Sequence, residues 1–273
     1  MSEFVHLQVK SHYSLRSGLP TPKDIVDAAQ KKGLKAVAMT DKNSFFGIIK
    51  FYNYAISKGV KPICGVDFDI ESNLKGLTKG LLLAKNKKGL EKLFSLSTKS
   101  YLQANKGIKI NENEILALRD DIIFILPSDN FSVYKSTDIQ EGKDVIATID
   151  ALKNTFSSNL YLGVTNYSDD AYDENSSNLI KFCSEKNIHA VALNDVHFIK
   201  QSDYLNHQAK VAINTGTHLR SEMENPSCSK EQYFKTFDEM KSNHKEDLLL
   251  NTFEIAKQCN CLLYTSDAAD DPT

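Results

Sequence analysis

Short apolar runs alternate with amphipathic stretches from the start of the chain to about residue 216. The apolar runs are rich in β-branched and aliphatic residues and have the length of buried strands, whereas the stretches between them show helical spacing. This alternation predicts an α/β fold in which repeated β-α units surround a parallel sheet or barrel. Seven runs are strand candidates, which favours a barrel: Val5–Val9, Ala36–Met39, Pro62–Phe68, Leu81–Ala84, Ile122–Leu126, Leu160–Val164 and Ala190–Leu193.

Helix signals lie between the strand candidates. Thr21 and Pro22 open one helix, because threonine caps a helix N-terminus and proline fits the first turn. Gly33 stands at the C-terminal end of that helix, where glycine is favoured. Further helices are expected over 46–58, closed by Gly59, and over 173–186.

The pattern changes after Gly216. Residues 220–229 contain Pro226 and several small polar residues, so we expect a surface loop there, followed by helices over about 231–240 and 245–257. The acidic, small-residue tail at 262–273 is expected to be non-native or disordered. We therefore predict a barrel over 1–216, a helical extension over 217–261 and a tail outside the fold.

Composition and charge exclude several classes of protein. Of the 273 residues, 41% are hydrophobic and 25% are charged, as in ordinary globular domains. The formal net charge of -2 gives no basic excess, so any DNA contact must be local or come from another part of a larger protein. The chain shows no signal peptide and no apolar run near the roughly 20 residues that span a bilayer. We expect a cytoplasmic protein without membrane contact.

The cysteines suggest free thiols. Cys64, Cys183, Cys228, Cys259 and Cys261 form neither a disulfide framework nor paired clusters with zinc spacing. Cys259 and Cys261 make a lone C-x-C without a second Cys/His pair nearby, so the sequence disfavours a metal site there.

Carboxylates stand at the ends of three strand candidates. Asp41 and Asp67 end apolar, β-branched runs, and Asp195 and His197 follow the run that ends at Leu193. Strand ends are where parallel α/β proteins build their sites. We expect the three acids to share one face.

These segments, taken in order, resemble the PHP (polymerase and histidinol phosphatase) domain found at the N-terminus of bacterial DNA polymerase III alpha subunits. Any one segment is a weak signal, whereas the ordered set is highly specific. The segments that carry the resemblance are His6–Leu15, Ala38–Lys42, Gly59–Phe68, Leu83–Asn86, Asn194–Phe198, Thr215–Gly216 and Asn251–Ala256, together with His207. The resemblance implies a distorted TIM-like (β/α)7 barrel of the PHP type with helices after the barrel.

The resemblance also implies a set of metal ligands, most of which this chain lacks. The first-strand H-x-H pair falls at Gln8 and Lys10, and later histidines fall at Lys42 and Lys79. A shorter acid, Asp67, replaces the usual glutamate. A cysteine expected after the fifth strand would lie near Ser128 or Asp129, and the remaining site positions are His12 and Asp41. Only Asp195 and His197 keep the ligand chemistry that the resemblance implies, and Asp67 keeps it in part.

A protonated lysine has no lone pair for a metal, and its charge repels divalent ions. We therefore expect a salt-bridged relic in which lysines pair with Asp41, Asp67 and Asp195. The alternative is a reduced single-ion site for Zn²⁺ or Mn²⁺ made by Asp67, Asp195 and His197. Of the other histidines, His6 and His207 are expected to be structural, and His189, His218 and His244 to lie on the surface or in loops.

The implied function is that of a catalytically silent domain without a cofactor of its own. By resemblance, the parent protein adds deoxynucleotides to DNA with Mg²⁺ held by palm-domain aspartates that lie outside this chain. This domain would brace the polymerase and dock the proofreading exonuclease subunit and other holoenzyme subunits. The alternative is an active metal-dependent phosphoesterase or 3′–5′ proofreading nuclease.

Overall fold

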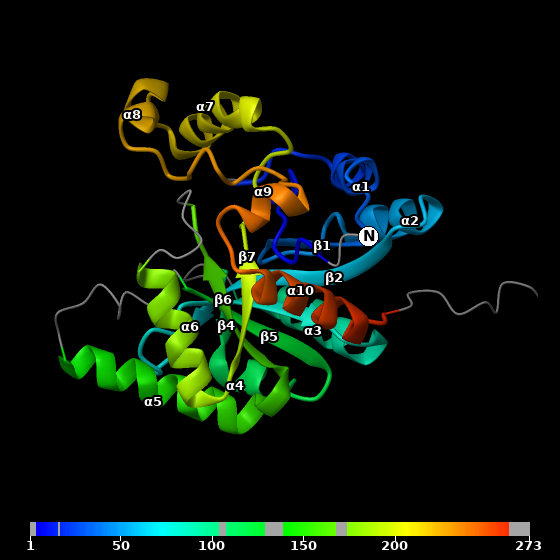
Figure 1. The fold of residues 1–273 in the computed structure, drawn as a ribbon. Coiled ribbons are helices and arrows are strands. Elements are labelled where there is room, and N and C mark those ends of the chain that lie inside the picture. The colour runs from blue at the N-terminus through cyan, green and yellow to red at the C-terminus, as the bar shows by residue number, and fades with distance from the viewer. Residues whose placement is uncertain (1–3, 16, 104–107, 129–138, 168–173, 262–273) are drawn as a thin grey trace, which may run out of the picture.

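The computed structural model describes residues 4–15, 17–103, 108–128, 139–167 and 174–261 (Figure 1). Strands in these residues pair in the order β1-β2-β3-β5-β6-β7, and the short β4 pairs with β2. Their bounds are β1 Ala36–Lys42, β2 Lys61–Glu71, β3 Lys79–Ala84, β4 Ile110–Asn111, β5 Ile122–Pro127, β6 Leu160–Thr165 and β7 His189–Leu193. The sheet curls into a half-barrel with helices around it and after it, so the predicted α/β architecture with helices after the barrel is confirmed.

One strand departs from the expected parallel arrangement. The strand β3 is antiparallel to both of its neighbours, β2 and β5, while the other pairs along the sheet order are parallel. The reason is the short connection between Glu71 and Lys79. A parallel crossover needs a dozen or more residues, so this link permits only an antiparallel return.

The predicted first strand, Val5–Val9, is not a regular strand. Its residues still bond to both sides, because Ala38 N donates to His6 O at 2.9 Å and Val196 N donates to Gln8 O at 2.9 Å. Thr40 N donates to Val9 O, so the segment advances three residues while β1 advances two. The register therefore breaks, and only Val9 and Val196 form an isolated bridge. The segment joins β1 to the chain just past β7.

The helix-end signals read from the sequence are confirmed. The helix α1 begins at Pro22 behind a capping box made by Thr21 and Asp24. Gly33 and Gly59 follow α1 and α2 with φ of 71° and 68°, a conformation that glycine adopts without strain. The helices up to β7 are α1 Pro22–Lys31, α2 Ile48–Ser57, α3 Lys87–Leu102, α4 Glu112–Leu116, α5 Ile139–Phe156 and α6 Glu174–Lys186.

Two expectations after β7 were wrong in detail. The expected loop at 220–229 contains a short helix, α8 Leu219–Glu224, which ends before Pro226. The expected helix over 231–240 is reduced to α9 Phe237–Lys241, because Tyr233 instead bridges Phe198 in extended form. The remaining helices are α7 Tyr204–Thr215 and α10 Glu246–Gln258. None of the helices in the described ranges is long and apolar enough to cross a membrane.

The helix α10 fills the inner face of the curled sheet (Figure 1). Ile255 and Ala256 join a buried cluster with inward-facing strand residues such as Ile63 and Leu83. A larger cluster lies on the other face, between the sheet and the helices around it. The last helix is therefore part of the core of the half-barrel.

Candidate functional site

Five of the expected site residues meet at one end of the half-barrel. Lys10 Nζ forms ion pairs with Asp195 Oδ1 and with Asp67 Oδ2, the second at 3.1 Å. Gln8 Nε2 donates to the same Asp67 oxygen at 3.1 Å. His197 Nε2 lies 3.1 Å from Asp195 Oδ2. The structure thus brings together the Gln8, Lys10, Asp67, Asp195 and His197 positions.

The Lys10 ammonium is a buried cation between two carboxylates. Its side chain is 5% exposed, against 8% for Asp67 and 21% for Asp195. Burial alone lowers the pKa of Lys10, but the charges of Asp195 and Asp67 outweigh it and raise this pKa above its ordinary value. Burial likewise raises the pKa of Asp195, but Lys10 and His197 outweigh it and lower that pKa. Lys10 and Asp195 are therefore held in their charged forms at neutral pH.

Asp41 does not share this face, contrary to the expectation for three strand-end acids. In β1 the side chains of Val37 and Met39 point to the outer cluster, and Asp41 has the same parity. Its carboxylate accepts bonds from Ser11 N, Ser11 Oγ and Ser14 Oγ at 2.6–2.7 Å. Burial raises the pKa of Asp41, although these bonds act against the rise. Asp41 fastens the loop after residue 10.

The side chains at the other expected positions make their contacts outside the Lys10 cluster. Lys42 Nζ pairs with Asp69 at 3.2 Å and is half-exposed, so its expected pairing with a site acid was wrong. Lys79 begins β3 and stands opposite Asp69 in the register of β2 and β3. His12 packs on the Tyr13 ring, with the ring centroids 4.3 Å apart. Ser128 Oγ accepts from Thr165 N at 3.2 Å, and Asp129 lies outside the described residues.

The metal site implied by the resemblance does not fit these residues. A divalent ion bound by Asp67 and Asp195 would need the space in which Lys10 Nζ contacts both carboxylates. The first-strand positions supply an amide and an ammonium in place of two imidazoles, and an ammonium cannot donate electrons to a metal. No chemical step can be derived through an ion at this place.

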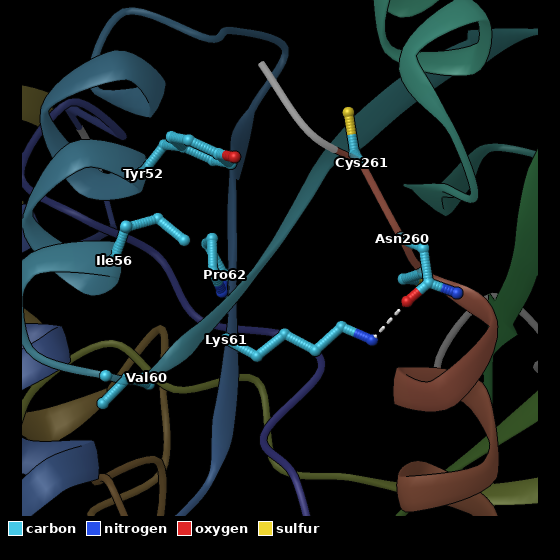
Figure 2. Close-up of a pocket in the computed structure, with 9 residues that line it drawn as sticks. Tyr52, Ile56, Val60, Lys61, Pro62, Asn260 and Cys261 are labelled. Carbon is cyan, nitrogen blue, oxygen red and sulfur yellow. Dashed lines mark hydrogen bonds between the residues drawn. The ribbon is translucent and has the colours of Figure 1, made fainter. Parts of the chain in front are cut away.

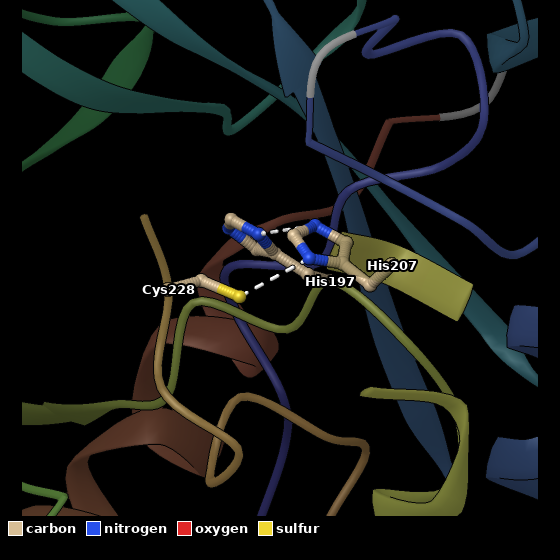
Figure 3. A group of neighbouring side chains, drawn as sticks. All are labelled: His197, His207 and Cys228. Carbon is tan, nitrogen blue, oxygen red and sulfur yellow. Dashed lines mark hydrogen bonds between the residues drawn. The ribbon is translucent and has the colours of Figure 1, made fainter. Parts of the chain in front are cut away.

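A second group of ligand-type side chains lies on the far side of His197 (Figure 3). His197 Nδ1 is 3.3 Å from His207 Nε2, and His207 Nδ1 is 3.1 Å from Cys228 Sγ. One ligand atom of each residue lies within 4.8 Å of the other two, and all three residues are buried. Burial lowers the pKa of His207 to about 4 and raises the pKa of Cys228 to about 12. The group is a possible metal site made of two imidazoles and one thiol.

Sequence reasoning missed this group. His207 was expected to be structural, and Cys228 carried no motif because it lies 21 residues from His207 in an irregular segment. His244, expected on the surface or in a loop, is also buried, and its Nε2 lies 3.2 Å from Val164 O. The sequence signals for this contact were two: the helical placement of His207, and the end of a strand before His197. These signals alone do not show that the two side chains are in contact.

A separate cavity of about 420 Å³ lies between α2 and the end of α10 (Figure 2). Lys61 Nζ reaches across it and donates to Asn260 Oδ1 at 2.8 Å. Cys259 and Cys261 are among its lining residues. The cavity lies at the start of β2, whereas Asp67 lies near its other end, so it is not continuous with the Lys10 cluster along this strand.

The sequence is similar to that of part of several bacterial DNA polymerase III alpha subunits. The chain is 31% identical over 274 residues to DNA polymerase III subunit alpha of Buchnera aphidicola subsp. Schizaphis graminum. It is 30% identical over 268 residues to that of Escherichia coli K12. These alignments cover 96% and 95% of this chain but only 23% of each relative.

A solved structure shows a similar fold, and a family model matches more than half of the chain. The structure is a two-domain protein from Bacteroides vulgatus described as containing a predicted PHP-like metal-dependent phosphoesterase, and its TM-score is 0.50. It is 14% identical, and the match covers 92% of this chain and 69% of that chain. The PHP domain model matches residues 6–165. Through that match, and as the ordered motifs led us to expect, the chain belongs to the PHP domain family and is homologous to part of DNA polymerase III alpha subunits.

Proposed function

We propose that this chain is the PHP domain of a DNA polymerase III alpha subunit and acts as a catalytically silent scaffold. The observation that carries the proposal is the Lys10 ammonium, which pairs with both Asp67 and Asp195. Metal-dependent phosphoester hydrolysis needs ions that activate water and neutralise charge on the reacting phosphate. A fixed lysine supplies the charge but cannot lower the pKa of a bound water as a metal does.

In the proposed parent protein, DNA synthesis belongs to domains outside this chain, which spans 23% of its curated relatives. Those domains would hold Mg²⁺ and contact DNA in the cytoplasm. Residues 1–216 would form the PHP barrel, and 217–261 would lead toward the palm domain. The tail at 262–273 would take no part.

The strand-end cluster is tested by adding Mn²⁺ to the purified chain with 3′-labelled DNA and with a phosphate monoester. We expect no metal-stimulated hydrolysis of either substrate. Hydrolysis that requires Mn²⁺ or Zn²⁺ would overturn the silent role and favour a phosphoesterase or 3′–5′ nuclease that uses Asp67, Asp195 and His197.

A reversion variant tests the assignment of the lost ligands. Changing the four positions back to histidine should raise the affinity for Mn²⁺ or Zn²⁺ in a calorimetric titration: Gln8→His, Lys10→His, Lys42→His and Lys79→His. A control variant with four exposed lysines replaced corrects for weak surface binding: Lys23→His, Lys31→His, Lys58→His and Lys181→His. Equal affinities of the two variants would mean that the positions are wrongly assigned.

The docking role is tested by titrating a labelled proofreading exonuclease subunit with the chain. We expect saturable binding that unlabelled chain reverses. Circular dichroism must first show that the chain is folded, and absence of binding by a folded chain would contradict docking at this domain.

A further inference from the structure

The group formed by His197, His207 and Cys228 lies where separate parts of the chain meet. His197 follows β7, His207 belongs to α7, and Cys228 lies in the irregular segment after α8. The three side chains come together in the view of Figure 3, where dashed lines join His207 to each of the other two. Their exposed fractions are 8%, 1% and 7%, so bulk water does not compete for the ligand atoms.

The hydrogen-bond partners determine which nitrogen of each ring carries the proton. His207 Nε2 lies 2.6 Å from Ser17 O, and a carbonyl oxygen only accepts, so Nε2 carries the hydrogen. Its lone pair is therefore on Nδ1, which faces Cys228 Sγ at 3.1 Å. His197 Nε2 similarly faces the Asp195 carboxylate at 3.1 Å, which leaves the lone pair of His197 on Nδ1. In the metal-free protein this Nδ1 lies 3.3 Å from His207 Nε2 and can accept its hydrogen.

Both rings thus have the arrangement that protein metal sites use. A ligating histidine donates its other N–H to a carboxylate or a backbone carbonyl, which orients the ring and strengthens the ligand. Asp195 plays this part for His197, and the Ser17 carbonyl plays it for His207. In the metal-free protein the remaining proton is the Cys228 thiol hydrogen, which can bond to His207 Nδ1.

We propose that His197, His207 and Cys228 bind one Zn²⁺ ion that fastens α7 and the segment after α8 to the end of the half-barrel. Two imidazoles and a thiolate suit Zn²⁺ and not Mg²⁺ or Mn²⁺, which prefer oxygen ligands. Tetrahedral Zn–N and Zn–S bonds of about 2.0–2.3 Å place donor atoms roughly 3–4 Å apart. One ligand atom of each residue already lies within 4.8 Å of the other two. Binding would draw the donor atoms closer together, and His197 Nδ1 would exchange its contact with His207 Nε2 for the ion.

Proton balance follows from the tautomers. Zn²⁺ takes the two Nδ1 lone pairs and the Cys228 sulfur, and the thiol proton leaves to solvent because a metal-bound thiol is deprotonated. Three protein ligands leave the fourth tetrahedral position for water. The site shares His197 with the strand-end positions, where the sequence led us to expect no cofactor, but it uses neither Asp67 nor any of the lysine positions.

Co²⁺ titration of the metal-free whole chain tests the proposal, because Co²⁺ replaces Zn²⁺ and absorbs visible light. We expect one Co²⁺ per chain, tetrahedral d–d absorption and a thiolate-to-cobalt charge-transfer band. Cys228→Ser should abolish the charge-transfer band, and His207→Gln should weaken Co²⁺ binding at least tenfold. Cys183→Ser, which changes another buried free thiol, is the matched control and should keep the band.

The outcomes separate clearly. A folded wild-type chain without the band, or a band that persists in Cys228→Ser, overturns the site. If Cys228→Ser does not fold, the Co²⁺ affinities of His207→Gln and Cys183→Ser are compared instead. Equal affinities of these two variants overturn the site. Zn²⁺ should also raise the Tm of the wild type and leave that of His207→Gln unchanged. None of these results depends on hydrolysis or on exonuclease binding, so the Zn²⁺ site can fail while the scaffold role stands.

Discussion

Lys10 shows how one substitution changes the chemistry of a strand end. A buried charge without a partner is costly, so Asp67 and Asp195 depend on the ammonium that lies between them. Gln8 adds a neutral donor to Asp67 at 3.1 Å, although its own Oε1 is buried without a hydrogen-bond partner in the described part of the chain. The cluster is consistent with a structural role.

Replacing Lys10 by methionine should lower the free energy of unfolding by about 3–5 kcal/mol, because the buried Asp67 carboxylate and the partly buried Asp195 carboxylate lose their countercharge. Urea unfolding at pH 7 measures the change. Lys42→Met is the matched control, since the half-exposed Lys42–Asp69 pair should contribute no more than about 1 kcal/mol. Similar losses in the two variants would contradict the structural role of the buried cluster.

The pH dependence follows from the lowered pKa of Asp195. A carboxyl group with a lowered folded-state pKa adds stability above its unfolded pKa of about 3.9, and this is lost as the pH falls toward the folded value. The stability difference between the wild type and Lys10→Met should therefore be full at pH 7 and shrink below about pH 4. Urea titrations across pH 3–7 measure it, and a difference that stays constant would show that Asp195 is not paired with Lys10.

Part of this site was predictable from residue types and strand parity. The loss of histidines at Gln8 and Lys10 and the pairing of lysine with Asp67 and Asp195 follow from the sequence. The parity of β1 could also have placed Asp41 on the outer face. Cys228 could not be placed, because its contact with His207 depends on an irregular segment without periodicity.

At the scale of elements, α10 is tied to the N-terminal segment by a side chain. Val5 N donates to Thr252 Oγ1 at 2.9 Å, and Thr252 is fully buried. Thr252 Oγ1 also donates to Leu249 O at 2.6 Å. The irregular segment thus donates to a helix side chain the hydrogen bond that a strand would normally donate to a neighbouring strand.

Thr252→Val should lower the free energy of unfolding by about 1–3 kcal/mol, because it leaves the buried Val5 N–H without an acceptor. Hydrogen exchange of the Val5 amide should become faster at the same time. Thr98→Val in α3 is the control, since Thr98 is exposed and its hydroxyl bonds only within its own helix. Unchanged Val5 exchange in a folded Thr252→Val variant would show that the bond does not hold the segment.

Capping residues and apolar patterns in the sequence predicted most helices and strands, but they did not predict how all of the strands pair. Thr21, Pro22 and Gly33 specify α1 because capping acts over a few residues. The antiparallel β3 follows from the short connection between Glu71 and Lys79, whereas the broken register of Val5–Val9 depends on which segments meet across the sheet, and apolar patterning does not encode that.

At the scale of the whole molecule, the inner core includes residues from both ends of the described chain. Val5 and Leu7 share one buried cluster with Ile255 and Ala256. A boundary at residue 216 therefore marks the end of the β-α alternation, while the apolar core continues beyond it.

A fragment of residues 1–216 should not unfold cooperatively, because the inner face of its sheet loses α10 and exposes apolar surface. A fragment of residues 1–261 should show one transition in urea by circular dichroism and by tyrosine fluorescence. Dye binding to exposed apolar surface should rise only in the shorter fragment. A cooperative transition of 1–216 with the stability of 1–261 would contradict the structural role of α10.

In the Lys10 cluster, the cation that neutralises Asp67 and Asp195 is a side chain covalently attached to the protein itself. A bound metal can be lost by dilution or extracted by a chelator, whereas a side chain stays at a fixed local concentration whatever the medium contains. The strand-end cluster that holds Asp67 and Asp195 should accordingly keep its shape through changes in metal supply.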